Sequence, residues 1–253
     1  MKSARVLPPR PSLSIVIPAF NEERRIGPSL ERLVGYARSR RLACELVVVD
    51  DGSTDATAKI ASGLGRRLGG LRLLRLERNQ GKGAAIRAGV LAARGKRVLF
   101  TDADLSTPPE DLPILERALD SGADLVVGSR ALDRSRIAVH QPLYREVAGR
   151  LFNVVVRCFS VPGIHDTQCG FKLFRTEVGR RLLQLQQIPR FGFDVEFLFL
   201  ARKAGYRVEE VSVRWTNSPE TTVRPLRDGA RAFLDIALIR LYAAQGRYRP
   251  LID

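Results

Sequence analysis

The sequence contains no run of about 18 consecutive apolar residues, the shortest stretch that usually crosses a lipid bilayer as a helix. Residues 1–12 carry charges and prolines around no apolar centre, so we expect an N-terminal tail and not a signal peptide. We therefore expect a protein that does not span a membrane, and whose contact with one would be peripheral or through a membrane partner protein.

Cysteine is also scarce. The chain has only Cys44, Cys158 and Cys169, and their spacing matches no metal-binding pattern. A few unpaired thiols are typical of a reducing compartment, so we expect the protein to be cytoplasmic. The 253 residues are 45% hydrophobic, which is enough to bury the core of one large α/β domain.

Acidic residues are outnumbered: 27 Asp and Glu stand against 42 Lys and Arg, for a net charge of +15. Such an excess favours an anionic partner, namely nucleic acid, a membrane surface or a phosphorylated substrate, although an Arg-rich source composition explains part of it equally well. A nucleic-acid module predicts aromatic residues interleaved with basic ones. Here the aromatic residues lie mostly in apolar stripes, so we expect no nucleic-acid partner.

Short apolar runs alternate with amphipathic segments through the first half of the chain. This pattern predicts βαβ units and a mainly parallel sheet flanked by helices, because both faces of such a sheet are covered. The expected strands are 13–17, 45–49, 71–76, 97–100 and 124–128, and Pro18 is expected to end the first. The expected helices are 21–40, 53–68, 84–94 and 109–120, with Asn21 as the N-cap of the first.

The second half is more helical. We expect a mobile loop at 129–141, helices at 142–159, 176–187, 194–204 and 225–242, and a strand at 206–215. The helices at 142–159 and 225–242 have Arg on faces other than the apolar one, so they are candidates for a membrane interface as well as for packing on the core. Glu196 lies on an apolar helix and is expected to bind sugar hydroxyls or pair with an Arg.

Polar residues follow the expected strands directly, on the edge of the sheet where α/β proteins bind ligands. Asp102 and Asp104 come just after one buried strand, and two carboxylates are what Mg²⁺ typically uses together with substrate phosphates. We therefore predict that they hold Mg²⁺ or Mn²⁺ against a diphosphate. Lys82, in a Gly-flanked helix start that suits phosphates, is a weaker candidate for the same ligand.

Six motifs occur in order at residues 17–22, 49–55, 79–89, 102–104, 128–130 and 166–174. Together they resemble the family 2 inverting glycosyltransferases with a GT-A fold. The resemblance is closest to dolichyl- or polyprenyl-phosphate sugar transferases, and it covers residues 13–215. The 166–174 stretch looks most like dolichyl-phosphate β-glucosyltransferases, which use UDP-glucose. Dolichyl-phosphate mannose synthases, which use GDP-mannose, are the nearest alternative.

The resemblance implies a set of donor-binding residues. The nucleotide sugar would be bound by Pro18, Ala19, Asn21, Glu22, Asp50, Asp51, Lys82, Asp102 and Asp104. Asp51 would accept a hydrogen bond from the base, and Asp50 would support that pocket. Asp104 would be the main metal ligand, beside Asp102 on the metal or the ribose. Ser106 stands where mannose synthases can have a Gln, and it is a poorer ligand.

A polyprenyl phosphate acceptor would already be anionic, so its oxygen could attack the sugar directly without a strong general base. Positive side chains must then hold two anions together. Arg130 is the first candidate for this acceptor-phosphate site, and Arg145 and Arg224 are the next. The resemblance makes Asp166 a catalytic residue with Arg130 and Asp104. If the acceptor were a hydroxyl, Asp166 would be the candidate base.

We therefore predict a metal-dependent enzyme that transfers glucose from UDP-glucose to a polyprenyl phosphate. The alternatives are transfer of mannose from GDP-mannose and transfer to a soluble hydroxyl acceptor. The expected domains are the tail at 1–12, the GT-A domain at 13–215 and a C-terminal helical segment at 216–253 that is a candidate for membrane association. The expected location is the cytoplasmic face of a membrane, through anionic lipid or a membrane partner.

Overall fold

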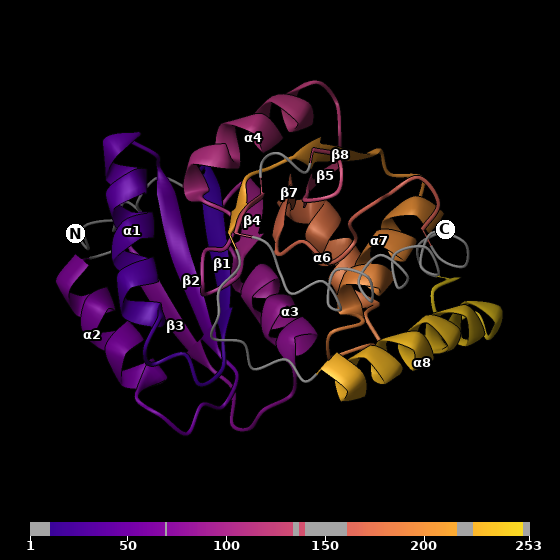
Figure 1. Ribbon diagram of the computed structural model, residues 1–253, viewed down its shortest axis with the longest axis horizontal. Coiled ribbons are helices and arrows are strands. Elements are labelled where there is room, and N and C mark those ends of the chain that lie inside the picture. The colour runs from indigo at the N-terminus through magenta and orange to yellow at the C-terminus, as the bar shows by residue number, and fades with distance from the viewer. Residues whose placement is uncertain (1–10, 69, 134–136, 140–160, 217–224, 250–253) are drawn as a thin grey trace, which may run out of the picture.

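The computed structural model describes residues 11–68, 70–133, 137–139, 161–216 and 225–249. A seven-stranded sheet forms its centre, in the spatial order β3-β2-β1-β4-β7-β5-β8 (Figure 1). Its strands are β1 (Leu13–Ala19), β2 (Cys44–Asp50), β3 (Leu71–Arg75), β4 (Arg97–Thr101), β5 (Leu125–Ser129), β7 (Phe171–Arg175) and β8 (Val208–Ser212). Neighbouring strands are parallel except that β7 runs antiparallel to both β4 and β5.

Helices cover both faces, as the continuous apolar strands require. One face is covered by α1 (Ile26–Ser39), α2 (Thr57–Leu68) and α4 (Leu112–Asp120), and a 3₁₀ turn η1 (Pro109–Asp111) leads into α4. The other face is covered by α3 (Lys82–Ala92), α6 (Thr176–Gln184) and α7 (Phe193–Lys203). The sheet residues alternate between these two cores: Val16 faces the second, whereas Ile15 and Ile17 face the first.

The long helix α8 (Pro225–Ala244) lies at the end of the molecule opposite α1 and α2, where it packs against α7 (Figure 1). Ile236 and Ile239 are buried, whereas Leu234 and Leu241 are exposed. None of the helices in the described residues combines the length and the apolar character that a bilayer crossing requires. The expected helix at 142–159 lies outside the described residues.

Most of the expected elements are confirmed, but β7 is a strand that the sequence pattern did not predict. The expected end of the first strand at Pro18 is also wrong, because β1 continues to Ala19. Pro18 lies beyond Val16, the last residue of β1 that pairs with β4, so its missing N–H removes no bond between these strands. Within the expected loop at 129–141, β6 (Ile137–Val139) pairs with β9 (Trp215–Thr216) as a second, two-stranded sheet.

Glu196 is fully buried on α7, and its partners differ from both of the expected ones. Its carboxylate accepts hydrogen bonds from the Tyr248 hydroxyl at 2.6 Å and from the backbone N–H groups of Gln187 and Ile188 at 2.8 and 2.9 Å. Burial raises the pKa of Glu196, against these donors. The residue therefore ties the turn after α8 to the interior of the domain, and neither a sugar nor an Arg is needed to explain it.

Replacing Tyr248 by Phe should destabilise the protein by about 1.5–3 kcal/mol, because a buried carboxylate loses a donor. The free energy of unfolding in urea measures this loss. Tyr206→Phe is the matched control, since the hydroxyl of Tyr206 has no hydrogen-bond partner among the described residues and this half-buried side chain lies in the loop before β8. Equal losses in the two variants would contradict the assignment.

Candidate active site

The loops after β1 and β2 are joined at the carboxyl edge of the sheet. The backbone N–H of Asn21 donates to Ser53 Oγ at 2.9 Å, and Asn21 Oδ1 accepts from the Thr54 N–H at 3.0 Å. The N–H of Glu22 donates to Thr57 Oγ1 at 2.7 Å. Asn21 has a positive φ of 55° and is not the N-cap of α1, which begins at Ile26. The expected capping role is wrong because the long-range bond to Thr54 uses the side-chain oxygen.

Asp51 is buried and organises the loop that leads into α3. Its carboxylate accepts hydrogen bonds from the Gln80 N–H at 2.8 Å, the Gly81 N–H at 2.8 Å and the Asn79 amide at 3.0 Å. Burial raises the pKa of Asp51, and the two backbone donors oppose that rise. A base contact at Asp51 stays a prediction, and it would have to be made by a carboxylate that already has three donors.

Asp50 is completely buried at the end of β2. Its Oδ1 accepts from the Ser53 N–H at 3.1 Å, and its Oδ2 lies 3.1 Å from Nε of Arg75. The neighbouring strand ends are close, since the N–H of Asp51 donates to the carbonyl of Ala19 at 2.8 Å. Asp50 therefore holds the turn that carries Asp51, and its expected support of a base pocket stays a prediction.

Asp102 and Asp104 follow β4 directly, and both remain partly exposed. Lys82, the first residue of α3, places its Nζ 2.6 Å from Asp102 Oδ1. Although burial opposes it, the negative charge of Asp102 raises the pKa of Lys82 above its ordinary value. Asp104 accepts the N–H of Ser106 at 2.9 Å. The sheet edge thus brings the two predicted metal ligands and the predicted phosphate-binding Lys together.

Glu22 adds a third carboxylate to this edge. Its two oxygens bind Arg25 at 2.7 and 2.8 Å, and Nη1 of Arg25 lies 4.0 Å from Asp104 Oδ2. Burial raises the pKa of Glu22, and the negative charges of Asp104 and Asp102 add to the rise against the Arg25 pair. Arg25 was not predicted from the sequence, because its role depends on contacts with the folded loop.

The donor set at this edge fits a divalent cation that keeps water and substrate phosphates as ligands. Asp102 and Asp104 supply hard carboxylate oxygens, which suits Mg²⁺ or Mn²⁺. Among the described residues, no cluster of three or more His, Cys, Asp or Glu could enclose a metal. A closed cage of protein ligands is therefore not what this part of the chain provides.

Asp166 and Arg130 form a two-pronged ion pair next to this edge. Arg130 donates from Nε to Asp166 Oδ2 at 2.6 Å and from Nη2 to Oδ1 at 2.7 Å, and its backbone N–H donates to Oδ2 at 3.0 Å. Asp166 is 1% exposed. Although burial works to raise it, the charge and hydrogen bonds of Arg130 lower the pKa of Asp166. Two of the three predicted catalytic residues, Asp166 and Arg130, are thus in direct contact.

Two further acceptor candidates, Arg145 and Arg224, lie outside the described residues. Pro18 is in β1 at the edge, and Ala19 ends the strand there. All the other predicted site residues surround the carboxyl ends of β1, β2, β4 and β5. Their placement on one edge is confirmed, whereas the ligands they would bind stay predictions.

A buried ion pair lies behind this edge and was missed from the sequence. Lys172 of β7 is fully buried, and its Nζ donates to Asp194 Oδ1 at 2.5 Å and to the carbonyl of Cys169 at 2.7 Å. The ammonium also lies 4.9 Å from the centre of the Phe100 ring. Burial raises the pKa of Asp194, against the nearby charges of Lys172 and Lys82. The only sequence signal for this pair was a Lys inside an otherwise apolar stretch.

Gly170 is a second residue that sequence reasoning left without a role. Its carbonyl accepts the N–H of Asp102 at 3.2 Å, and a Cβ at this position would lie 1.9 Å from Asp102 Oδ2. The Asp102 carboxylate therefore packs directly against the backbone of Gly170. No larger side chain fits there without moving Asp102.

Three comparisons place the chain among known proteins. The profile of Glycosyl transferase family 2 matches residues 14–183. A dolichyl-phosphate β-glucosyltransferase of Trichomonas vaginalis is 39% identical over 82% of this chain, which spans 66% of that protein's length. The dolichyl-phosphate β-glucosyltransferase of Drosophila melanogaster is 36% identical over 95% of this chain and 78% of its own length.

The fold is similar to that of glucosyl-3-phosphoglycerate synthase from Mycobacterium tuberculosis, solved with Mn²⁺, UDP-glucose and phosphoglyceric acid. The TM-score is 0.66 over 90% of this chain and 79% of the other, at 21% identity. At that identity the similarity speaks for the fold alone, and it agrees with the GT-A architecture expected from the motifs.

Gly170→Ala should weaken Mn²⁺ binding about 10- to 100-fold, because the added methyl group displaces the carboxylate of Asp102. Calorimetric titration with Mn²⁺ in the presence of UDP measures the change. Gly63→Ala is the control: it lies on α2, and a Cβ there would meet nothing within 4 Å. Unchanged Mn²⁺ affinity in the Gly170 variant would refute a role for Asp102 in holding the cation.

Lys172→Met should cost about 3–5 kcal/mol of folding stability, because it leaves the carboxylate of Asp194 buried without its partner. The double variant Lys172→Met/Asp194→Leu should regain most of that loss, since both charges are then gone. Urea unfolding of the two variants and the wild type makes the comparison. If the double variant is no more stable than the single one, the ion pair is not the reason for burying Lys172.

Proposed function

Because the chain belongs to glycosyl transferase family 2, we propose that this glycosyltransferase moves glucose from UDP-glucose to dolichyl phosphate or a related polyprenyl phosphate. The similarity to dolichyl-phosphate β-glucosyltransferases supports both the sugar and the lipid. UDP-glucose is the donor named for the solved glucosyl-3-phosphoglycerate synthase complex, which shares the fold. The residues at the sheet edge give this proposal its chemistry.

The observation that carries the acceptor proposal is that both oxygens of the Asp166 carboxylate already accept hydrogen bonds. Both of its oxygens bind Arg130, it is buried, and its pKa is lowered, so it is a poor base for removing a proton from a hydroxyl. An acceptor that is already an anion needs no base. The pair therefore favours a phosphate acceptor over a hydroxyl acceptor, with Arg130 as the group that attracts it.

One nitrogen of the Arg130 guanidinium remains for such an acceptor. Its Nε and Nη2 are used by Asp166, and within the described ranges Nη1 has no hydrogen-bond partner. A guanidinium suits a phosphate because it presents planar, permanently charged N–H donors. We assign Nη1 to the acceptor phosphate and Asp166 to orienting the guanidinium, so Asp166 is a positioning residue in this proposal.

The donor diphosphate would lie at the part of the sheet edge that carries Asp102, Asp104 and Lys82, which we call the donor half. The two carboxylates would hold Mg²⁺ or Mn²⁺, which when bound would neutralise the diphosphate and favour the departure of UDP. Lys82 adds a positive charge at the start of α3, where the helix N-terminus also favours anions. The loops that carry Asn21, Glu22 and Asp51 would then enclose the nucleotide.

The reaction requires one displacement at the anomeric carbon of glucose. A phosphate oxygen of the acceptor forms the new bond to that carbon from one side, while the bond to the UDP oxygen breaks on the other. The configuration is inverted, and no proton has to be moved. The work of Arg130 and Lys82 is to hold two anionic reactants near each other, against their repulsion.

A polyprenyl acceptor also implies contact with a membrane. We propose that the protein meets the cytoplasmic face of the membrane peripherally or through a membrane partner. Leu234 and Leu241 support this, because they are exposed on α8 on the same side of the helix, one heptad apart. The net charge of +15 would add attraction to anionic lipid.

The test is a transfer assay with radiolabelled UDP-glucose, Mn²⁺ and dolichyl phosphate in detergent micelles. We expect label in the lipid fraction with dolichyl phosphate but not with dolichol, which lacks the phosphate. Asp104→Asn should lower the rate at least about 100-fold, whereas Glu110→Gln, at an exposed carboxylate paired with Arg32, should not.

Two results would overturn the proposal. Transfer to dolichol or to a soluble hydroxyl, with none to dolichyl phosphate, would refute the phosphate acceptor. Product formation from GDP-mannose but not from UDP-glucose would refute the donor and indicate a mannosyltransferase. In either case the effect of Asp104→Asn would still report whether the sheet edge is the active site.

A further inference from the structure

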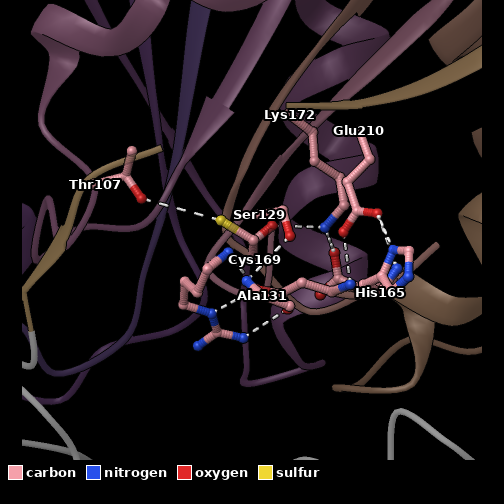
Figure 2. A network of polar contacts seen from close by, with 10 residues as sticks. Thr107, Ser129, Ala131, His165, Cys169, Lys172 and Glu210 are labelled. Carbon is pink, nitrogen blue, oxygen red and sulfur yellow. Dashed lines mark hydrogen bonds and ion pairs between the residues drawn. The ribbon is translucent and has the colours of Figure 1, made fainter. Parts of the chain in front are cut away.

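Glu210 of β8 holds the segment that carries Asp166, and no part of the mechanism above uses it. Its Oε2 accepts the backbone N–H of His165 at 2.9 Å, and its Oε1 accepts the N–H of Asp166 at 2.8 Å. The ring Nδ1 of His165 lies 3.0 Å from the same Oε2. Figure 2 shows the Glu210 side chain directed at His165, with these contacts dashed. One carboxylate thus receives two consecutive backbone donors.

This carboxylate is nearly as inaccessible as Asp166 itself. The Glu210 side chain is 7% exposed, although the strand that carries it lies at the edge of the sheet. Burying a carboxylate is costly unless hydrogen bonds compensate it. Here the compensation comes from the peptide groups on either side of the Cα of His165, so the bonds fix the backbone direction from which the Asp166 side chain starts.

The orientation of Arg130 therefore depends on two successive sets of hydrogen bonds. Glu210 fixes the backbone of Asp166, and the Asp166 carboxylate fixes the guanidinium through Nε and Nη2. The guanidinium also lies over the indole ring of Trp215 of β9, with Cζ 5.4 Å from the centre of the ring. An arginine side chain otherwise has many rotamers, and holding it in one costs conformational entropy.

Trp215 is itself attached to the metal side of the site. The N–H of the next residue, Thr216, donates to the carbonyl of Ser106 at 2.9 Å. Ser106 in turn donates its own N–H to Asp104. Arg130 thus contacts both the segment held by Glu210 and a strand bonded to the loop of the predicted metal ligand.

We propose that Glu210 is a positioning residue for Arg130, and that it acts with Trp215 to present Nη1 of the guanidinium to the anionic acceptor. The identity of that anion as a lipid phosphate rests on the proposed function. The orientation of Arg130 does not, since it follows from the contacts alone. Within the described residues Glu210 contacts His165 and Asp166 and none of Asp102, Asp104 and Lys82, so its effect is on the affinity and alignment of the acceptor.

The chain offers a matched control one residue away. Glu209 belongs to the same strand, but its side chain is 37% exposed and its carboxylate lies 3.4 Å from Nη2 of Arg207. Glu209→Gln therefore removes the same charge from the same strand without touching His165 or Asp166. Glu210→Gln keeps the shape of the side chain but replaces one acceptor oxygen with an NH₂ group that faces a backbone N–H.

The first measurement uses tryptophan fluorescence, because Trp215 is the single tryptophan of the chain. A guanidinium held over the indole ring perturbs its emission, so the spectrum reports the position of Arg130 without any substrate. We expect Arg130→Ala and Glu210→Gln to shift the emission in the same direction, the double variant to match Arg130→Ala, and Glu209→Gln to match the wild type.

The second measurement is steady-state kinetics with UDP-glucose and dolichyl phosphate. Glu210→Gln should raise the KM for dolichyl phosphate about tenfold and leave the KM for UDP-glucose unchanged. In an Arg130→Ala background the same substitution should have no further effect on kcat/KM. A general structural role would instead change both KM values and add to the loss caused by Arg130→Ala.

Failure of this inference is distinguishable from failure of the proposed function. If Glu210→Gln keeps the wild-type emission while Arg130→Ala changes it, Glu210 does not position Arg130, whatever the substrate. If Glu210→Gln raises both KM values, its role is structural and the inference is overturned. If the wild type makes no product from dolichyl phosphate, the proposed function fails, and the fluorescence series still decides the role of Glu210.

Discussion

The reversed direction of β7 is the constraint on which the site depends. Because β7 runs antiparallel between β4 and β5, its first residue pairs with Thr101, the last residue of β4. The loop before β7 therefore reaches the same sheet edge as the loops that follow the parallel strands. That loop carries Asp166 at one end and Gly170 at the other. A fully parallel sheet would have placed it at the opposite edge, away from Arg130 and Asp102.

A single short segment consequently supports both halves of the edge. Asp166 orients Arg130 on the proposed acceptor side, and Gly170 contacts Asp102 on the proposed donor side. Between them, the carbonyl of Cys169 is held by the buried ammonium of Lys172. Opposite charges alternate through this region, so burial of each charge is compensated by a neighbour. Both sets of contacts are thereby carried by five consecutive residues, 166–170.

Much of this arrangement could be predicted from the sequence, because the parallel strands are continuous apolar runs and the site residues follow them directly. Asp102 and Asp104 were predicted in this way. The strand β7 was missed since Lys172 interrupts its apolar pattern, and Lys is compatible with a buried strand only when a distant partner, Asp194, is present. The bond from Thr54 to Asn21 and the role of Glu210 were equally out of reach, because they join segments more than 30 residues apart.

The contact between Glu196 and Tyr248 has a consequence for how the protein is made. The two residues are 52 positions apart, and Glu196 lies in the first turn of α7. During synthesis on the ribosome, α7 emerges well before Tyr248 does. Until then Glu196 lacks one of its donors, and the interior around α7 is incomplete. The parallel half of the sheet can form early, whereas the last part of the core must wait for the turn after α8 to leave the exit tunnel.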